Sequence, residues 1–324
     1  MQIPYLSLMR QSWMRSSYLS FPLLVHCVVV LVATACAPGP TEAESSPDPG
    51  SPRLHRVGDI APPDGFRRAS VKADSFAQYL RDLKLLQSRT VYLYNGSPKS
   101  NQKAHFRVVD LSVGNKDLQQ CADALLRLRA EYHFGAGDFQ SIRYSFTSGH
   151  VSSYQKWRQG YRPVIRGNSV NFAKKAAPDT SRQGFMNYLE NLFTYAGTIS
   201  LKRDSIAVSL SPGAATNANG SEPPHTPGGA ADPRAGDFFL QSGSPGHAVM
   251  ILDVVANEAG QRLYLLGQSY MPAQQFHVLK NPNLDGKPVP GLEEEGAVWY
   301  SLSPSGEVYT PEWSFPPGSL RRWK

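Results

Sequence analysis

The chain has 324 residues, enough for one or two domains with a substantial hydrophobic core. Its net charge is +7, but no dense tract of lysine and arginine alternates with aromatic residues, which argues against a nucleic-acid-binding protein. The mild positive excess suits an anionic envelope or an acidic polymer without identifying a partner.

The first predicted element is a signal sequence over residues 1–35. Arg10 and Arg15 precede an apolar stretch, YLSFPLLVHCVVVLVATAC, that has signal-peptide length and ends in small residues. The final ATAC resembles a bacterial lipobox, which implies that Cys36 is lipidated and becomes the mature N-terminus. An ordinary secretory signal and an uncleaved anchor are the alternatives. The predicted location is the bacterial cell envelope, lipid-anchored at the outer membrane or periplasmic face, or secreted if the lipobox is not used.

Residues 36–58 are predicted to be a disordered tether, because they are polar and proline-rich and carry no core pattern. The exported part of the chain then keeps a single cysteine, Cys121, since Cys27 and Cys36 belong to the signal or its end. A disulfide scaffold is therefore excluded.

Residues 59–324 are predicted to form a single α+β domain, an antiparallel sheet with helices packed on it. The predicted helices are 75–86, with Ser75 as N-cap, 117–134, 154–163 and 181–201. The predicted strands are 90–96, 105–114, 141–149, 238–240, 247–255 and 262–267, the last three as an antiparallel meander. Residues 211–235, rich in glycine, proline and alanine, are predicted to be a flexible insertion in which His225 is exposed.

The helix over residues 117–134 carries the cysteine. Asp117 is its predicted N-cap, with Gln120 three residues later in capping-box register. Cys121 belongs to an apolar stripe at helical spacing and is expected to point inward near the first turn. The helix N–H groups favour a thiolate there. The alternative is that Cys121 packs as a small buried hydrophobe.

His247 opens a near-continuous apolar run, AVMILDVV. Strand alternation puts His247, Val249, Ile251 and Asp253 on one face. The histidine is either a packed core residue or a group that faces a cleft and does chemistry.

The hairpin that follows predicts a neighbour for this histidine. A four-residue loop at 257–260 pairs Ala256 with Gln261 and places His247 opposite Tyr270, with Gln268 diagonal to it. The Gln268 amide can then accept from the imidazole and hold its tautomer. A loop of another length changes this assignment.

The segments GDFFL, GHAVMILDV and LLGQSY resemble the histidine half of papain-like envelope hydrolases, the NlpC-type and CHAP-type amidases and endopeptidases. Gly236–Asp237, Gly246–His247 and Gln268 match in order, and Gln120–Cys121 fits the cysteine step. The resemblance implies a possible decorated papain-like core. It also implies Cys121 as nucleophile, His247 as base and Gln268 as the residue that orients the imidazole. The 126 residues between Cys121 and His247 exceed the usual gap in small NlpC-type domains.

A second resemblance covers roughly residues 60–324. The segments DLQQCADALLRLRAEY, FTYAGTISL, SPGHAVMILDV, QSYMPAQQFHVLKNP and TPEWSF are similar to the bacterial family known as domain of unknown function 4846. This resemblance implies a bacterial envelope location and supplies no established activity.

The leading hypothesis is a cell-envelope lipoprotein with a papain-like cysteine hydrolase site for an amide, such as a peptidoglycan peptide. The residues given accessory roles are Asp237, Gln120 and Tyr270. One alternative is a non-catalytic envelope lipoprotein that binds cell-wall polymer or a protein partner, in which Cys121 is fully buried. Another is a hydrolase or transferase whose cleft uses Asp237, His247 and Tyr270.

The hypothesis requires no cofactor, and the sequence has no HExxH, no closely spaced histidine pair and no CxxC to suggest a metal site. The predicted partners are the membrane, through the N-terminal lipid, and peptidoglycan or an envelope protein. Nucleic acid is not among them.

Overall fold

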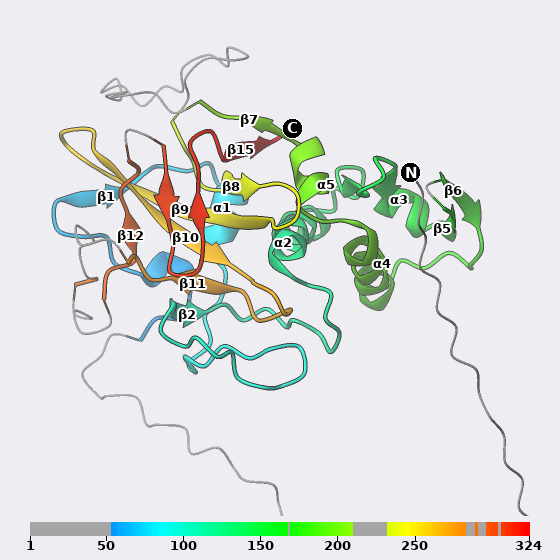
Figure 1. The fold of residues 1–324 in the computed structure, drawn as a ribbon, viewed down its shortest axis with the longest axis horizontal. Helices are drawn as coiled ribbons and strands as arrows, with labels where there is room; N and C mark the ends of the chain where they lie inside the picture. The colour runs from blue at the N-terminus through cyan, green and yellow to red at the C-terminus, as the bar shows by residue number, and fades with distance from the viewer. Residues whose placement is uncertain (1–52, 168, 210–231, 283–288, 291–295, 304–305) are drawn as a thin grey trace, which may run out of the picture. The chain divides into compact units, whose positions relative to one another are not determined.

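Figure 1 shows the fold in a computed structural model of the chain. The structure describes residues 53–167, 169–209, 232–282, 289–290, 296–303 and 306–324, all within one compact unit that spans residues 46–324. The predicted signal sequence, Cys36, most of the tether and nearly all of the predicted insertion, with His225, lie outside the described residues.

A nine-stranded antiparallel sheet is the centre of the fold (Figure 1). Its path runs β2-β11-β10-β9-β8-β15-β7, while β1 also pairs with β9 and β12 with β10. The predicted α+β class with an antiparallel sheet is confirmed. The strands are β1 (Phe66–Arg68), β2 (His105–Val108), β7 (Ser205–Ala207), β8 (Phe238–Gln241), β9 (His247–Asn257), β10 (Arg262–Gln268), β11 (His277–Leu279), β12 (Trp299–Tyr300) and β15 (Leu320–Trp323).

The remaining elements are helices and three two-stranded hairpins. The helices are η1 (Val57–Asp59), α1 (Phe76–Arg81), α2 (Cys121–Gly135), α3 (Tyr154–Trp157), α4 (Arg182–Tyr195) and α5 (Thr198–Arg203). The hairpins are β3 (Arg143–Ser145) with β4 (Val151–Ser153), β5 (Tyr161–Arg166) with β6 (Ser169–Lys174), and β13 (Val308–Tyr309) with β14 (Ser314–Phe315). Among the described residues, no helix is both long and apolar enough to cross a membrane.

Several element boundaries differ from the predicted ones. Ser75 caps α1 as expected, accepting from the Gln78 N–H at 3.2 Å, but the helix ends at Arg81. Residues 90–96 form only isolated bridges, and residues 161–166 form a strand instead of extending a helix. Gly160 explains the second change, because its φ of 94° stops the helix and a Cβ there would meet the Ala176 carbonyl oxygen at 2.0 Å.

The sheet buries both of its faces. One hydrophobic cluster packs the sheet against α1 and α2. From β9 it includes Ala248, Met250 and Leu252. The other hydrophobic cluster packs against β13 and β14 and includes Val249 and Ile251 of β9. Leu54 and Val57 are also buried in the first cluster, so the packed part of the chain includes residues that were assigned to the tether.

The β9–β10 hairpin has a shorter turn than predicted and a compensating bulge. Arg262 lies opposite Ala256, so the predicted pairing of Ala256 with Gln261 is wrong by one residue. A register shift between Leu265 and Leu266 then places Leu266 opposite Ile251. From that point the strands follow the register that the four-residue loop would have given.

The same bulge moves Asp253 off the predicted face. Asp253 accepts hydrogen bonds from Arg81 of α1 at 2.7 Å and from Arg68 of β1 at 2.9 Å. It therefore points toward the helices, and the prediction that it shares the His247 face is wrong. The cause is the extra residue that the bulge inserts into β9, which interrupts strict alternation.

Asp253→Ala is expected to lower the free energy of unfolding by about 3–5 kcal/mol, because it leaves the buried Arg81 without its carboxylate partner. Urea denaturation measures this change. Glu258→Ala, at the exposed turn of the same hairpin, is the matched control and is expected to cost less than about 0.5 kcal/mol. Equal losses in the two variants would contradict a stabilising role for the Asp253 ion pair.

Candidate functional site

Helix α2 begins at Cys121, so the cysteine is the first helical residue. Gln120 is the N-cap, and its N–H donates to the Asp123 carboxylate at 3.2 Å. The predicted capping box, with Asp117 as N-cap, is therefore wrong by three residues. The Asp117 carboxylate is used elsewhere, since it accepts the Ala273 N–H at 2.7 Å and ties the segment before α2 to the loop after β10.

His247 is the first residue of β9, and the glycine before it has a steric role. A Cβ on Gly246 would lie 2.4 Å from the Gly243 carbonyl oxygen and 2.8 Å from the Thr198 Oγ1. Thr198, at the start of α5, also accepts the Gly243 N–H at 3.1 Å. The loop before His247 is therefore packed too closely to accept a side chain at position 246.

The structure brings Cys121, His247 and Gln268 to one place. The backbone N–H of Ala248, the residue after His247, donates a hydrogen bond to the Cys121 sulfur. His247 Nε2 lies 2.8 Å from Gln268 Oε1, and His247 Nδ1 has no hydrogen-bond partner. We call Cys121, His247 and Gln268 the Cys–His–Gln cluster.

Aromatic rings surround the imidazole. The Tyr270 ring lies 4.8 Å from that of His247, centroid to centroid, in an edge-on arrangement. The rings of Trp313 and Phe315 lie at 5.1 and 5.9 Å. His247 has no exposed surface, whereas the neighbouring Tyr270 and Trp313 are partly exposed.

Two of the predicted accessory residues have structural contacts instead. The buried Asp237 carboxylate pairs with Arg322 through two hydrogen bonds, at 2.8 and 2.7 Å, and so joins β8 to β15. The Gln120 side chain donates to Asp117 at 3.0 Å. Among the three accessory residues, only Tyr270 touches the histidine.

Two residues linked to the cluster by hydrogen bonds, Glu312 directly and Lys99 through Glu312, were not predicted from the sequence. Glu312 accepts a hydrogen bond from Gln268 Nε2 at 2.9 Å and from Lys99 Nζ at 2.5 Å. Both side chains are mostly buried. The segment TPEWSF contains Glu312, but it lies far from the other residues in sequence and has no chemical motif that would have revealed the contact.

Burial sets the charge state of the cluster. It raises the pKa of the Cys121 thiol to about 11, with Asp123 adding to the rise and the Ala248 N–H opposing it. Burial also lowers the pKa of His247 to about 4, against the effect of the Gln268 hydrogen bond. At neutral pH the site therefore holds a protonated thiol and a neutral imidazole. The thiolate expected from the helix N-terminus does not form at rest.

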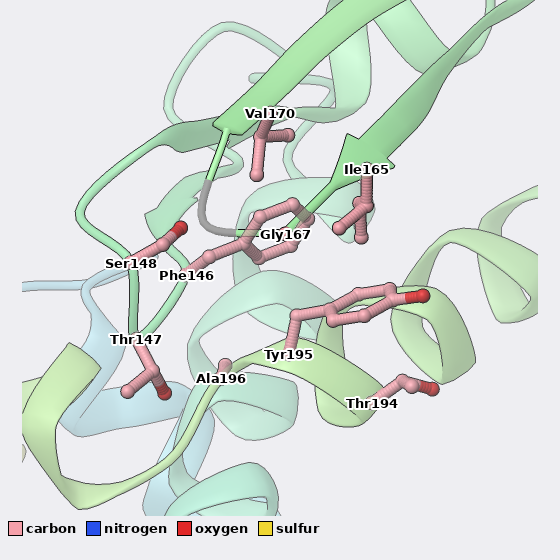
Figure 2. Close-up of a pocket in the computed structure, with 9 residues that line it drawn as sticks. All are labelled: Phe146, Thr147, Ser148, Ile165, Gly167, Val170, Thr194, Tyr195 and Ala196. Carbon is pink, nitrogen blue, oxygen red and sulfur yellow. The ribbon is translucent and has the colours of Figure 1, made fainter.

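Two surface cavities in the described part of the chain have none of the cluster residues in their lining. Figure 2 shows one of about 280 Å³, where the Tyr195 and Phe146 rings lie near Ile165 of β5. A second, of about 460 Å³, shares Thr194 with the first and is bordered by Leu118, three residues before Cys121. Neither cavity is lined by Cys121, His247 or Gln268. Within the described ranges, no group of three or more histidine, cysteine, aspartate or glutamate side chains could hold a metal.

These features define an α+β protein with a closed Cys–His–Gln cluster at the start of a helix and the ends of two paired strands. A family model described as domain of unknown function (4846) matches residues 57–322, and the chain belongs to this family. No curated protein matches the chain, and no solved structure matches it.

Alkylation of Cys121 by iodoacetamide is expected to be slow at pH 7 and to rise about tenfold per pH unit toward pH 11, because only the thiolate reacts. Mass spectrometry of the Cys121 peptide gives the rate. His247→Ala is expected to leave the shape of this profile unchanged, since the ring is already neutral. A fast plateau between pH 5 and 8 would reveal a resting thiolate–imidazolium pair and contradict this charge state.

Proposed function

We propose that this protein is a cell-envelope lipoprotein that hydrolyses an amide bond through Cys121 and His247. The observation that carries the proposal is the arrangement of the Cys–His–Gln cluster. The sulfur lies beside the backbone of the residue after His247, and Gln268 binds one ring nitrogen while the other has no partner. A nucleophile, a base and a group that orients the base are the parts that covalent acyl transfer requires.

In this reaction the His247 Nδ1 takes the thiol proton as the Cys121 sulfur bonds to the substrate carbonyl carbon. The tetrahedral intermediate collapses when the C–N bond breaks and the imidazolium returns the proton to the departing amine. The same ring then takes a proton from water as the water oxygen attacks the thioester. The carboxylic acid departs as the sulfur recovers a proton from the ring, which restores the thiol.

The negative charge that develops on the carbonyl oxygen requires hydrogen-bond donors. Cys121 is the first residue of α2, so its N–H has no carbonyl partner within the helix. This N–H is the proposed oxyanion donor. Because Cys121 is 4% exposed, substrate access would require neighbouring side chains to move, and the partly exposed rings of Tyr270 and Trp313 beside His247 are the proposed ones.

The proposed substrate is a peptidoglycan peptide or a related amide, by analogy with the papain-like envelope hydrolases that the sequence resembles. Location supports this choice, because a lipid on Cys36 would hold the domain at the membrane within reach of the cell wall. The mild positive charge of the chain suits an anionic envelope.

A second candidate is a non-catalytic lipoprotein of the same fold that binds cell-wall polymer or a protein partner. One observation favours it: Cys121 is only 4% exposed and His247 has no exposed surface. A buried thiol with a raised pKa is what a packing role would produce.

Incubation of the purified mature protein with peptidoglycan sacculi, followed by chromatography and mass spectrometry of released peptides, separates the two candidates. Cys121→Ala is expected to abolish release, and His247→Ala to slow it by about 10²–10⁴-fold through loss of the base. His133→Gln, at the opposite end of α2, is the control and is expected to match the wild type. Binding to sacculi without release by the wild type would favour the non-catalytic candidate.

The lipid anchor has a separate test. Cys36→Ala is expected to abolish incorporation of labelled palmitate and to move the protein from the membrane fraction to the soluble fraction, because one modified cysteine supplies the anchor. Cys27→Ala is the matched control and is expected to retain the label. Unlabelled wild-type protein in the soluble fraction would support the secretory alternative.

A further inference from the structure

A buried hydrogen-bond chain runs from Lys99 to His247 through two intermediate side chains. Lys99 Nζ lies 2.5 Å from Glu312 Oε2, the same oxygen lies 2.9 Å from Gln268 Nε2, and Gln268 Oε1 lies 2.8 Å from His247 Nε2. Lys99 precedes β2, while Glu312 lies between β13 and β14. Segments that are distant in sequence therefore meet on the Nε2 side of the imidazole.

We propose that Glu312, held by Lys99, is a positioning residue that sets the proton of His247 on Nε2 through the Gln268 amide. The inference rests on the proposed function for its catalytic value. The proton arrangement itself can be measured whether or not the protein hydrolyses a substrate.

The argument follows from which groups can donate. An ionised carboxylate accepts hydrogen bonds and donates none, so the Gln268 NH₂ group must face Glu312. The Gln268 carbonyl oxygen must then face His247, and because that oxygen only accepts, His247 Nε2 must carry the proton. His247 Nδ1 then keeps its lone pair, which a base for the Cys121 thiol requires.

Without the acceptor oxygen of Glu312 this order can reverse. With no acceptor at position 312, the Gln268 amide can turn over and bring its NH₂ group toward His247. Nε2 would then accept, the proton would move to Nδ1, and the ring would lose its lone pair on the side away from Gln268. The direction of the hydrogen bonds from Glu312 to His247 therefore depends on Glu312 as an acceptor.

Lys99 is the ion-pair partner of Glu312. The Lys99 side chain is 4% exposed and that of Glu312 12%, so each is largely removed from water and each needs the other. Within the described ranges, the only salt bridge of Lys99 is the one with Glu312.

The test is the tautomer of His247, measured by multiple-bond ¹H–¹⁵N correlation NMR on histidine-labelled protein, with His247→Asn to assign the signal. The wild type is expected to hold the Nε2–H tautomer alone. Detection of Nδ1–H as the main wild-type form would overturn the proposal without any variant of Lys99 or Glu312.

The double variant Lys99→Met/Glu312→Met removes both charges together, so no buried ion is left without a partner. The ratio of Nε2–H to Nδ1–H is expected to fall at least about tenfold, because the Gln268 amide is then free to turn over. Lys99→Met/Glu312→Gln restores an acceptor and is expected to recover part of the ratio. Glu307→Gln, an acid next to β13, is the control and is expected to leave it unchanged. A wild-type ratio in a folded double methionine variant would overturn the proposal.

Kinetics separate this inference from the proposed function. If sacculi are hydrolysed, the double methionine variant is expected to lower kcat about tenfold with little change in KM, because it alters the base and not the binding surface. Hydrolysis that persists with an unchanged tautomer would refute the positioning role and leave the function intact. A locked wild-type tautomer without hydrolysis would refute the function and leave the positioning role intact.

Discussion

The β-bulge in the β9–β10 hairpin is the constraint on which the candidate site depends. Near the turn the two strands pair one residue out of the register that would align His247 with the end of β10. The shift between Leu265 and Leu266 corrects this, and Gln268 then reaches the imidazole. A one-residue slip moves every side chain to the opposite face of a strand, so without the bulge Gln268 would point away from the histidine.

The local parts of this site could be predicted from the sequence, and the distant parts could not. Cys121 and His247 stand out because a helix and a strand begin at or near them, and these signals are local. The turn length was predicted one residue too long, and the bulge that offsets it leaves no mark in the alternation of β9 and β10. Glu312 joins the site through the tertiary fold alone, so no spacing could have connected it with Gln268.

The same contrast between local and tertiary effects explains the raised pKa of the Cys121 thiol. A helix N-terminus stabilises a negative group by about 0.3–1 kcal/mol, and that effect is visible in the sequence. Burial raises the pKa of Cys121 from 9.0 to about 11, which corresponds to about 3 kcal/mol in favour of the protonated form. The larger effect depends on how α2 packs against β9, so it became apparent only from the structure.

The hydrogen bonds from Glu312 through Gln268 to His247 matter because the imidazole is neutral. A charged imidazolium donates from both nitrogens, so its orientation would need no control over which nitrogen holds the proton. Neutral imidazole has two tautomers, and only one of them leaves Nδ1 able to accept a proton. Because burial keeps His247 neutral, the site must select between these tautomers, and Glu312 selects by accepting from Gln268. The burial of His247 and the hydrogen bonds from Glu312 therefore act together: burial keeps the imidazole neutral, and the hydrogen bonds select its tautomer.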